Sequence, residues 1–259
     1  MLVVGLQGRH RLPYSLARLQ VAIMINREWL QSWIQSQHLE NEAVERYRDC
    51  FVAHPTRLVW IKDFLQAGVA ERLSRFLQTE AEFLTEHGIY STEGAVTEER
   101  WLAASEDDRF FRLRKLKGTA HGFQMSRNAL TYVQFRQAFQ RPEFRAFFEA
   151  ISGLTLGWSD DFGSHSMIQG DFLRPHSDDN RNRQLALVIY LSPGWKTSFG
   201  GALHVIDKDG TETTISPDYN SMVAFDVLTE SKHLVSTITA DAGSNARLTI
   251  GGWYHRTAS

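Results

Sequence analysis

The sequence predicts a mainly β fold with helical support (α+β), in which a cupin-like jelly-roll core fills the C-terminal third of 259 residues. From about residue 166 onward, short apolar or alternating segments recur between turn signals made of Gly, Pro and Asp. Before that point, apolar residues recur mostly at helical spacing. Regular short strands separated by such turns favour a sandwich or barrel over a parallel α/β sheet.

The N-terminal half predicts helices that pack around this core. An apolar stripe at helical spacing begins after Asn26, which is a good N-cap residue. A second helix is expected over 69–87, and a third over 132–151, where Pro142 breaks or restarts it. Strands are expected to interrupt the helices at 58–62 and 109–117.

The core strands are expected at regular intervals along the C-terminal part. A polar run over 178–184 predicts a loop after the first of them, and residues 208–210 predict a hairpin turn. The expected strands cover residues 166–173, 185–191, 202–206, 221–227, 233–239 and 247–254.

We expect one structural domain in three parts. Residues 1–27 would form an N-terminal arm, which contains four arginines and no acidic residue, so that a chain starting at Met24 should be tolerated. Residues 28–165 would form a helical and lid region packed on the core, and residues 166–259 the jelly-roll core itself.

Composition excludes several classes of protein. A chain with 42% hydrophobic and 12% aromatic residues can bury a sizeable core and is not disordered. A formal charge of −2 gives no general attraction to nucleic acid or to anionic membranes. The single Cys50 permits no intrachain disulfide, and no run approaches the roughly 18 apolar residues of a membrane helix. We therefore expect a cytoplasmic protein with no nucleic-acid or membrane partner, whose oligomeric state these features do not indicate.

The most informative motif is His176-Ser-Asp178, which is followed by His233 and then by Arg247. Side chains at positions i and i+2 of an extended strand point the same way, so His176 and Asp178 can bind one metal. Two histidines and a carboxylate occupy one face of an octahedron, the arrangement typical of non-haem iron(II) oxygenases. The helical His-Glu-x-x-His signature of zinc hydrolases is absent. The motif therefore predicts an iron site, and Arg247 could anchor an acidic co-substrate.

The chain from residue 166 to residue 254 resembles the double-stranded β-helix core of prolyl-hydroxylase-like 2-oxoglutarate/iron(II) dioxygenases. Residues 170–178 resemble the family's strand that leads into its His-x-Asp ligands, and residues 183–192 with Trp195 resemble the strand and turn that follow. Residues 200–203 match its Gly-Gly strand entry, and the spacing from His233 to Arg247 and Trp253 also matches. These features follow the order and approximate spacing of that family.

The resemblance implies a role for each matched residue. Iron(II) would be bound by His176, Asp178 and His233. Arg247 would pair with the distal carboxylate of 2-oxoglutarate, because its planar guanidinium holds a carboxylate in a bidentate manner. Thr249 and Tyr190 would add hydrogen bonds to that carboxylate.

The implied chemistry is oxidative. It uses O2 and 2-oxoglutarate, with ascorbate as a reductant, and releases succinate and CO2. It hydroxylates an unactivated C–H bond of a small amino-acid-like or prolyl substrate, of which a small amino-acid-like molecule is favoured.

Two other classes of function stay open at this point. A cupin-like isomerase or lyase would keep the metal and would not need Arg247 or 2-oxoglutarate. A non-catalytic binding module would keep only the jelly roll, which hosts many functions, and would leave the three-ligand set unexplained. The triplet Asp161-Phe-Gly163 also occurs in kinases, but the chain lacks a kinase Gly-rich loop and catalytic loop, so the match indicates chance.

Overall fold

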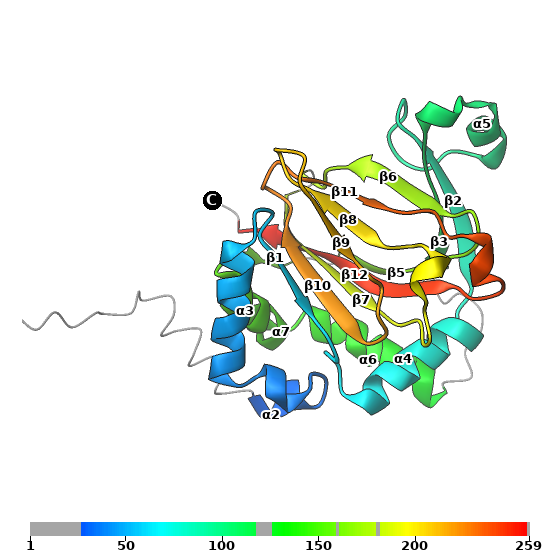
Figure 1. The fold of residues 1–259 in the computed structure, drawn as a ribbon. Coiled ribbons are helices and arrows are strands. Elements are labelled where there is room, and N and C mark those ends of the chain that lie inside the picture. Colours follow the sequence, from blue (N-terminus) through cyan, green and yellow to red (C-terminus); the bar gives the residue numbers. More distant parts are fainter. Residues whose placement is uncertain (1–26, 118–125, 159–160, 180–181, 258–259) are drawn as a thin grey trace, which may run out of the picture.

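An antiparallel sheet of twelve strands is the centre of the computed structural model, which describes residues 27–117, 126–158, 161–179 and 182–257 (Figure 1). The strands are β1 (Leu58–Ile61), β2 (Phe83–Ile89), β3 (Arg109–Leu116), β4 (Leu156–Gly157), β5 (Phe162–Met167), β6 (Phe172–His176), β7 (Arg183–Tyr190), β8 (Leu203–Ile206), β9 (Glu212–Ile215), β10 (Ser221–Asp226), β11 (Lys232–Val235) and β12 (Arg247–Arg256). Their order is β1-β10-β7-β12-β5-β3-β6-β11-β8-β9, with β2 beside β3 and β4 beside β12.

The strands form a nearly closed barrel of the double-stranded β-helix type. One apolar cluster fills its interior and joins side chains of β1, β7 and β10 to side chains of β8, β9 and β11. This arrangement confirms the predicted mainly β fold with helical support. The sheet also begins before residue 166, since β1, β2, β3 and β5 all belong to it.

Helices cover one outer face of the barrel. The described α-helices are α2 (Arg27–Gln31), α3 (Asn41–Ala53), α4 (Ala67–Thr79), α5 (Glu98–Ala103), α6 (Arg127–Phe139) and α7 (Pro142–Ser152). Figure 1 shows α3, α4, α6 and α7 together on this face, whereas α5 lies apart beside β2. Pro142 occupies the first turn of α7, where its missing N–H costs nothing, and so restarts the helical region as predicted.

Alternation along two neighbouring strands sorts their side chains between the helices and the barrel interior. Leu187 on β7 and Leu248 on β12 belong to the cluster that packs against the helices. The residues between such positions point the other way, because strand side chains have a period of two. Tyr190 on β7, and Arg247 and Thr249 on β12, therefore face the barrel interior.

Two predicted elements are wrong in extent. The helix expected over 69–87 ends at Thr79, and its last part is the strand β2. β2 pairs along its whole length with β3, and this long-range pairing overrides the local helical spacing. The strand expected over 166–173 is two strands, β5 and β6, separated by a turn in which Gly170 has a φ of +82°.

Other boundaries differ by less, and part of the expected organisation lies outside the described residues. The strand expected over 233–239 ends at Val235, while α3 and β9 were not predicted. The expected N-terminal arm, apart from Arg27, lies outside the part of the chain that the structure describes, as does the proposed cap Asn26. Among the described helices, none has the length and apolar character needed to cross a membrane.

Candidate metal centre

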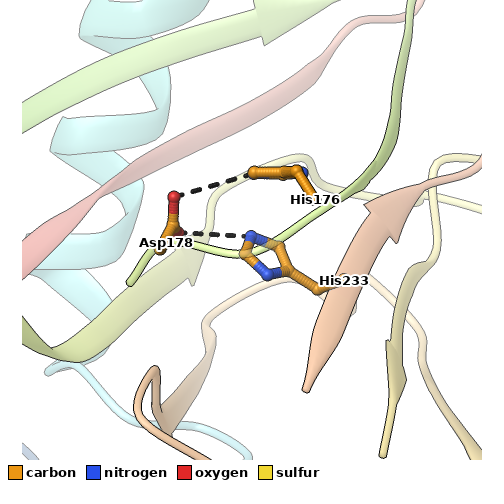
Figure 2. A group of neighbouring side chains, drawn as sticks. All are labelled: His176, Asp178 and His233. Carbon is orange, nitrogen blue, oxygen red and sulfur yellow. Dashed lines mark ion pairs between the residues drawn. The ribbon is translucent and has the colours of Figure 1, made fainter. Parts of the chain in front are cut away.

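Two histidines face each other across the neighbouring strands β6 and β11. His176 is the last residue of β6 and pairs in register with His233 of β11, and their ring centroids are 4.1 Å apart. Asp178 lies two residues beyond the end of β6, and its carboxylate lies beside both rings (Figure 2). The distances are 3.3 Å from His233 Nε2 to Asp178 Oδ2 and 3.7 Å from His176 Nε2 to Asp178 Oδ1.

These three side chains have the geometry of a metal-binding group. One donor atom from each lies within 4.8 Å of the other two donors, so a single ion could contact all three. Asp178 and His233 are buried and His176 is half-buried, which leaves one side of the group open. The set of two imidazoles and one carboxylate suits iron(II) better than Mg²⁺ or Ca²⁺, which prefer oxygen ligands.

The protonation of the group also suits a metal. His176 Nδ1 lies 3.0 Å from the carbonyl oxygen of Arg174, and a carbonyl only accepts, so Nδ1 donates and Nε2 keeps its lone pair. Burial, and then the charge of His233, lower the pKa of His176 to about 4, so its ring is neutral at pH 7. Burial alone would raise the pKa of Asp178, but His233, His176 and Arg183 together lower it to about 2.

Arg247 is a buried cation without a carboxylate partner among the described residues. Only 4% of its surface is exposed, its Nε donates to the carbonyl oxygen of Gly201 at 2.7 Å, and its Nη1 lies 3.6 Å from the sulfur of Met167. Its guanidinium carbon lies 5.1 Å from the centre of the Tyr190 ring. Burial lowers the pKa of Arg247, because the charged form is deprived of water. A buried charge is usually paired, so we expect an anion to bind next to Arg247.

Polar side chains form a row across the sheet next to Arg247. Thr249 pairs in register with Tyr190 on one side and with His165 on the other, and His165 pairs with Lys115. The Tyr190 hydroxyl is buried and makes no hydrogen bond with any described residue. Burial is the main reason why the pKa of His165 is lowered to about 4, and the charges of Lys115 and Arg247 lower it further. Tyr190, Thr249 and His165 therefore offer uncharged hydrogen-bonding groups beside a buried cation.

A cavity of about 200 Å³ joins the metal-binding group to Arg247. Five of the six residues predicted for the site line it, namely His176, Asp178, His233, Arg247 and Thr249. Tyr190 does not line it and lies against Arg247 instead. Leu173, Leu203 and Val235 supply apolar walls. The cavity thus has a metal-binding end, a cationic end and little room between them, which fits a short dicarboxylate that chelates a metal.

The sequence of this region decides its relationship to known proteins. Residues 162–255 match the description of the 2OG-Fe(II) oxygenase superfamily. Residues 162–255 are therefore a domain of this superfamily. Members use iron(II), 2-oxoglutarate and O2, which agrees with the donor set and with the buried cation of this site.

Three relatives illustrate the range of the similarity. The chain is 31% identical over 119 residues to the prolyl 3-hydroxylase OGFOD1 of Mus musculus, a match that covers 44% of this chain and 22% of that protein. The corresponding protein of Xenopus laevis is 30% identical over 133 residues, which cover 49% of this chain and 24% of that protein. The chain therefore spans less than a quarter of the length of these curated relatives. A crystal structure of a Pseudomonas putida prolyl-4-hydroxylase has the same fold, with a TM-score of 0.54 at 20% identity, covering 83% of this chain and 100% of that one.

Sequence reasoning missed two residues of this site. His165 lines the cavity, and only its register with Thr249 places it there. Arg183 was assigned to a strand without a role, yet it contacts Asp178. Trp253 was matched to the family by spacing alone, and its indole nitrogen also contacts Asp178. Regular alternation gave no signal for Arg183, because it lies an odd number of positions before Tyr190 and the β7–β12 register shifts beside it. Asp161, its other partner, had been set aside with the kinase-like triplet.

Proposed function

We propose that this chain is a 2-oxoglutarate- and iron(II)-dependent dioxygenase that hydroxylates an unactivated C–H bond of a prolyl substrate. The observation that carries the proposal is the buried Arg247, which lacks a carboxylate partner among the described residues and shares a cavity with a three-ligand group. A bound metal alone would explain why the three ligands converge, but only an anionic co-substrate also explains the buried charge of Arg247.

In this proposal the two ends of the cavity hold the two ends of 2-oxoglutarate. His176, Asp178 and His233 would hold iron(II), and the keto acid end of 2-oxoglutarate would bind the same ion. Bound iron and 2-oxoglutarate supply the oxidising chemistry, which consumes O2 and yields succinate, CO2 and a hydroxylated product. The remaining work of the protein is to orient these groups, exclude water and present one C–H bond.

Arg247 orients the distal carboxylate. Its Nε is already committed to Gly201, so the terminal nitrogens are the groups left for the ligand. A fork of this kind fixes the direction of a carboxylate as well as attracting it. Thr249 lies two positions along the same strand face, and Tyr190 lies against the guanidinium with an unbonded hydroxyl, so both can donate to the same carboxylate.

The mouth of the site supports a prolyl substrate. Phe110 packs edge-on against the His176 ring with centroids 5.2 Å apart, and Tyr90 stacks on Phe110 at 4.8 Å. Tyr90 is 48% exposed, so an aromatic surface leads from the solvent to the metal-binding group. Aromatic faces pack well on apolar rings such as that of proline. The curated relatives are named as prolyl hydroxylases, which supports the same class of substrate.

The two alternatives account for less of the site. A cupin-like isomerase or lyase that needs no 2-oxoglutarate leaves the buried charge of Arg247 without a function. A non-catalytic binding module leaves the convergence of three donors without a function. A test of the co-substrate distinguishes all three.

The test is visible absorption of metal-free protein after anaerobic addition of iron(II) and then 2-oxoglutarate. We expect a charge-transfer band in the wild type, no band in His233→Ala, and a band that needs more 2-oxoglutarate in Arg247→Ala. His204→Ala is the matched control, because His204 pairs with Glu212 on β8–β9 and does not line the cavity. Iron uptake without a band would favour the cupin-like alternative, and failure to bind iron would favour the binding module.

The substrate class needs a second measurement. Peptides containing one proline should stimulate succinate release and gain the mass of one oxygen atom. Free proline and other free amino acids should do so much less well if the exposed aromatic surface contacts residues beyond the target ring. Equal stimulation by free proline would instead support the small amino-acid-like substrate.

A further inference from the structure

Arg183 lies between two carboxylates beside the metal-binding group. Its Nη1 donates to Asp178 Oδ1 at 3.1 Å, and its Nε donates to Asp161 Oδ2 at 2.9 Å. Its guanidinium carbon also lies 3.3 Å from the centre of the Trp253 ring, a close cation–π contact. The Arg183 side chain is 10% exposed and the Asp161 side chain is 32% exposed, and a rotation of Arg183 would break all three contacts.

Trp253 adds a second fixed donor to the same carboxylate. Its Nε1 donates to Asp178 Oδ2 at 2.9 Å, so each oxygen of Asp178 accepts one N–H from a different residue. Arg183 comes from β7 and Trp253 from β12, which are paired neighbours in the sheet. Asp178 itself lies beyond the end of β6. Its orientation therefore depends on donors that a rigid part of the sheet supplies.

We propose that Arg183 is a positioning residue that, together with Trp253, holds the Asp178 carboxylate in its metal-facing orientation, while Asp161 holds and neutralises the Arg183 guanidinium. Outer partners of this kind orient metal ligands and typically change metal affinity about 10- to 100-fold when removed. This inference rests on the proposed function only in requiring that the group of three side chains binds a metal.

Because Arg183 is a cation, electrostatic repulsion and positioning predict opposite changes in metal affinity when Arg183 is removed. A cation next to a ligand carboxylate weakens that ligand and repels a divalent ion. If only this repulsion mattered, removing the cation would tighten metal binding. A positioning role predicts the reverse, because the freed carboxylate rotates away from the other two ligands. Asp161 offsets the repulsion, since an Asp161–Arg183 pair is close to neutral and leaves the charge of Asp178 for the metal.

The experiment measures the dissociation constants of iron(II), under anaerobic conditions, and of cobalt(II) for the wild type and three variants. Arg183→Gln removes the charge and the paired donors, and Arg183→Lys keeps only the charge. Trp253→Phe keeps an aromatic ring but removes the N–H and part of the ring surface. We expect each variant to bind both metals about 10- to 100-fold more weakly. Arg141→Gln is the matched control, because Arg141 makes similar bonds to Glu143, the nearer at 2.9 Å, and does not line the cavity.

A further variant tests the part played by Asp161, which accepts a hydrogen bond from Arg183. Asp161→Asn keeps the shape of the side chain and removes its charge, so Arg183 would act on Asp178 without compensation. We expect weaker metal binding than in the wild type, but a smaller loss than in Arg183→Gln. Unchanged or tighter binding in Asp161→Asn would overturn the neutralising role.

The absorption spectrum of cobalt(II) at saturation separates positioning from a general effect on the fold. A rotated Asp178 would change the coordination of the metal and therefore the position and intensity of the cobalt bands. A merely structural role would leave the saturated spectrum unchanged, and that result would overturn the proposal, as would unchanged affinities in both Arg183 variants and in Trp253→Phe. Failure of the wild type to bind iron or cobalt would overturn the proposed function as well, so the two failures are distinguishable.

Discussion

The carbonyl oxygen of Gly201 accepts a hydrogen bond from Arg247 Nε at 2.7 Å, and the Cα of Gly201 lies where no larger residue fits. A Cβ at this position would lie 2.8 Å from Arg247 Cδ and 2.6 Å from Ile238 Cδ1. The backbone of Gly201 also has a φ of +72°, which favours glycine. A glycine on the loop before β8 therefore sets the position of the cation in the cavity.

Gly201→Ala should weaken 2-oxoglutarate binding and destabilise the protein by more than the about 1–2 kcal/mol expected from the backbone alone. Gly194→Ala is the matched control, because Gly194 has a φ of +67° and nothing within 4 Å of its added Cβ. Denaturant unfolding of both variants isolates the crowding at Gly201, and titration of the charge-transfer band measures the affinity. Equal stability and equal affinity in the two variants would contradict this account.

Arg247→Lys should raise the KM for 2-oxoglutarate by about 10- to 100-fold while the protein stays folded. Lysine keeps the positive charge but cannot donate two parallel hydrogen bonds to a carboxylate, and a charged hydrogen bond is worth about 1.5–3 kcal/mol. The measurement is succinate release as a function of 2-oxoglutarate concentration, with the thermal midpoint as the check on folding. An unchanged KM would show that Arg247 does not orient the co-substrate.

Tyr190→Phe should affect stability and binding in opposite directions. The buried hydroxyl has no partner among the described residues, so its removal should leave the ligand-free protein equally stable or up to about 1–3 kcal/mol more stable. If the hydroxyl donates to the co-substrate, affinity for 2-oxoglutarate should fall about 3- to 10-fold. Thermal unfolding with and without 2-oxoglutarate measures both effects. A variant that loses stability without the ligand would indicate a partner for the hydroxyl within the protein.

His165 should make the metal-free protein less stable in mild acid. Its pKa is lowered to about 4, chiefly by burial, from the ordinary value of 6.5. As pH falls from about 6.5 towards 4, the unfolded chain takes up a proton that the folded protein does not, so the free energy of unfolding falls. Between pH 7 and pH 5 this one group would account for about 2 kcal/mol.

His165→Asn isolates that contribution. Other histidines, including His176, titrate in both proteins, so the difference in their pH dependence belongs to His165. We expect the variant to lose about 2 kcal/mol less than the wild type between pH 7 and pH 5, as measured by urea unfolding at each pH. Parallel curves for the two proteins would show that the pKa of His165 is the same in the folded and unfolded states, which would contradict its shift by burial.

The parts of the site that follow local rules could be predicted from the sequence. His176 and Asp178 are two positions apart near a strand end, and Arg247 and Thr249 share one strand face, so alternation alone brings each pair to the same side. The strands after residue 183 were recognisable because turn residues separate them. Pro142 marked a helix start because its missing N–H fits only the first turn.

The remaining features depend on pairing between distant segments. Residues 83–89 have helical spacing of apolar residues but form a strand, because β3 provides a partner that no local pattern reveals. His165 reaches the cavity through the register of β5 with β12, and Arg183 contacts Asp161 and Asp178 through the meeting of three chain segments. Such pairing registers cannot be deduced from the sequence alone, and for that reason the positions of these residues at the site were missed.

The pairing of His176 with His233 has a consequence for the whole barrel. An ion bound to both would cross-link the ends of the chain segment that contains β7, β8, β9 and β10, in a protein whose single cysteine forms no internal disulfide. Closing a loop of this length restricts the unfolded chain by about 4 kcal/mol in the chain-entropy estimate used for disulfides. The metal would thus act as a removable cross-link, and its removal by a chelator would destabilise the half of the barrel that carries the site.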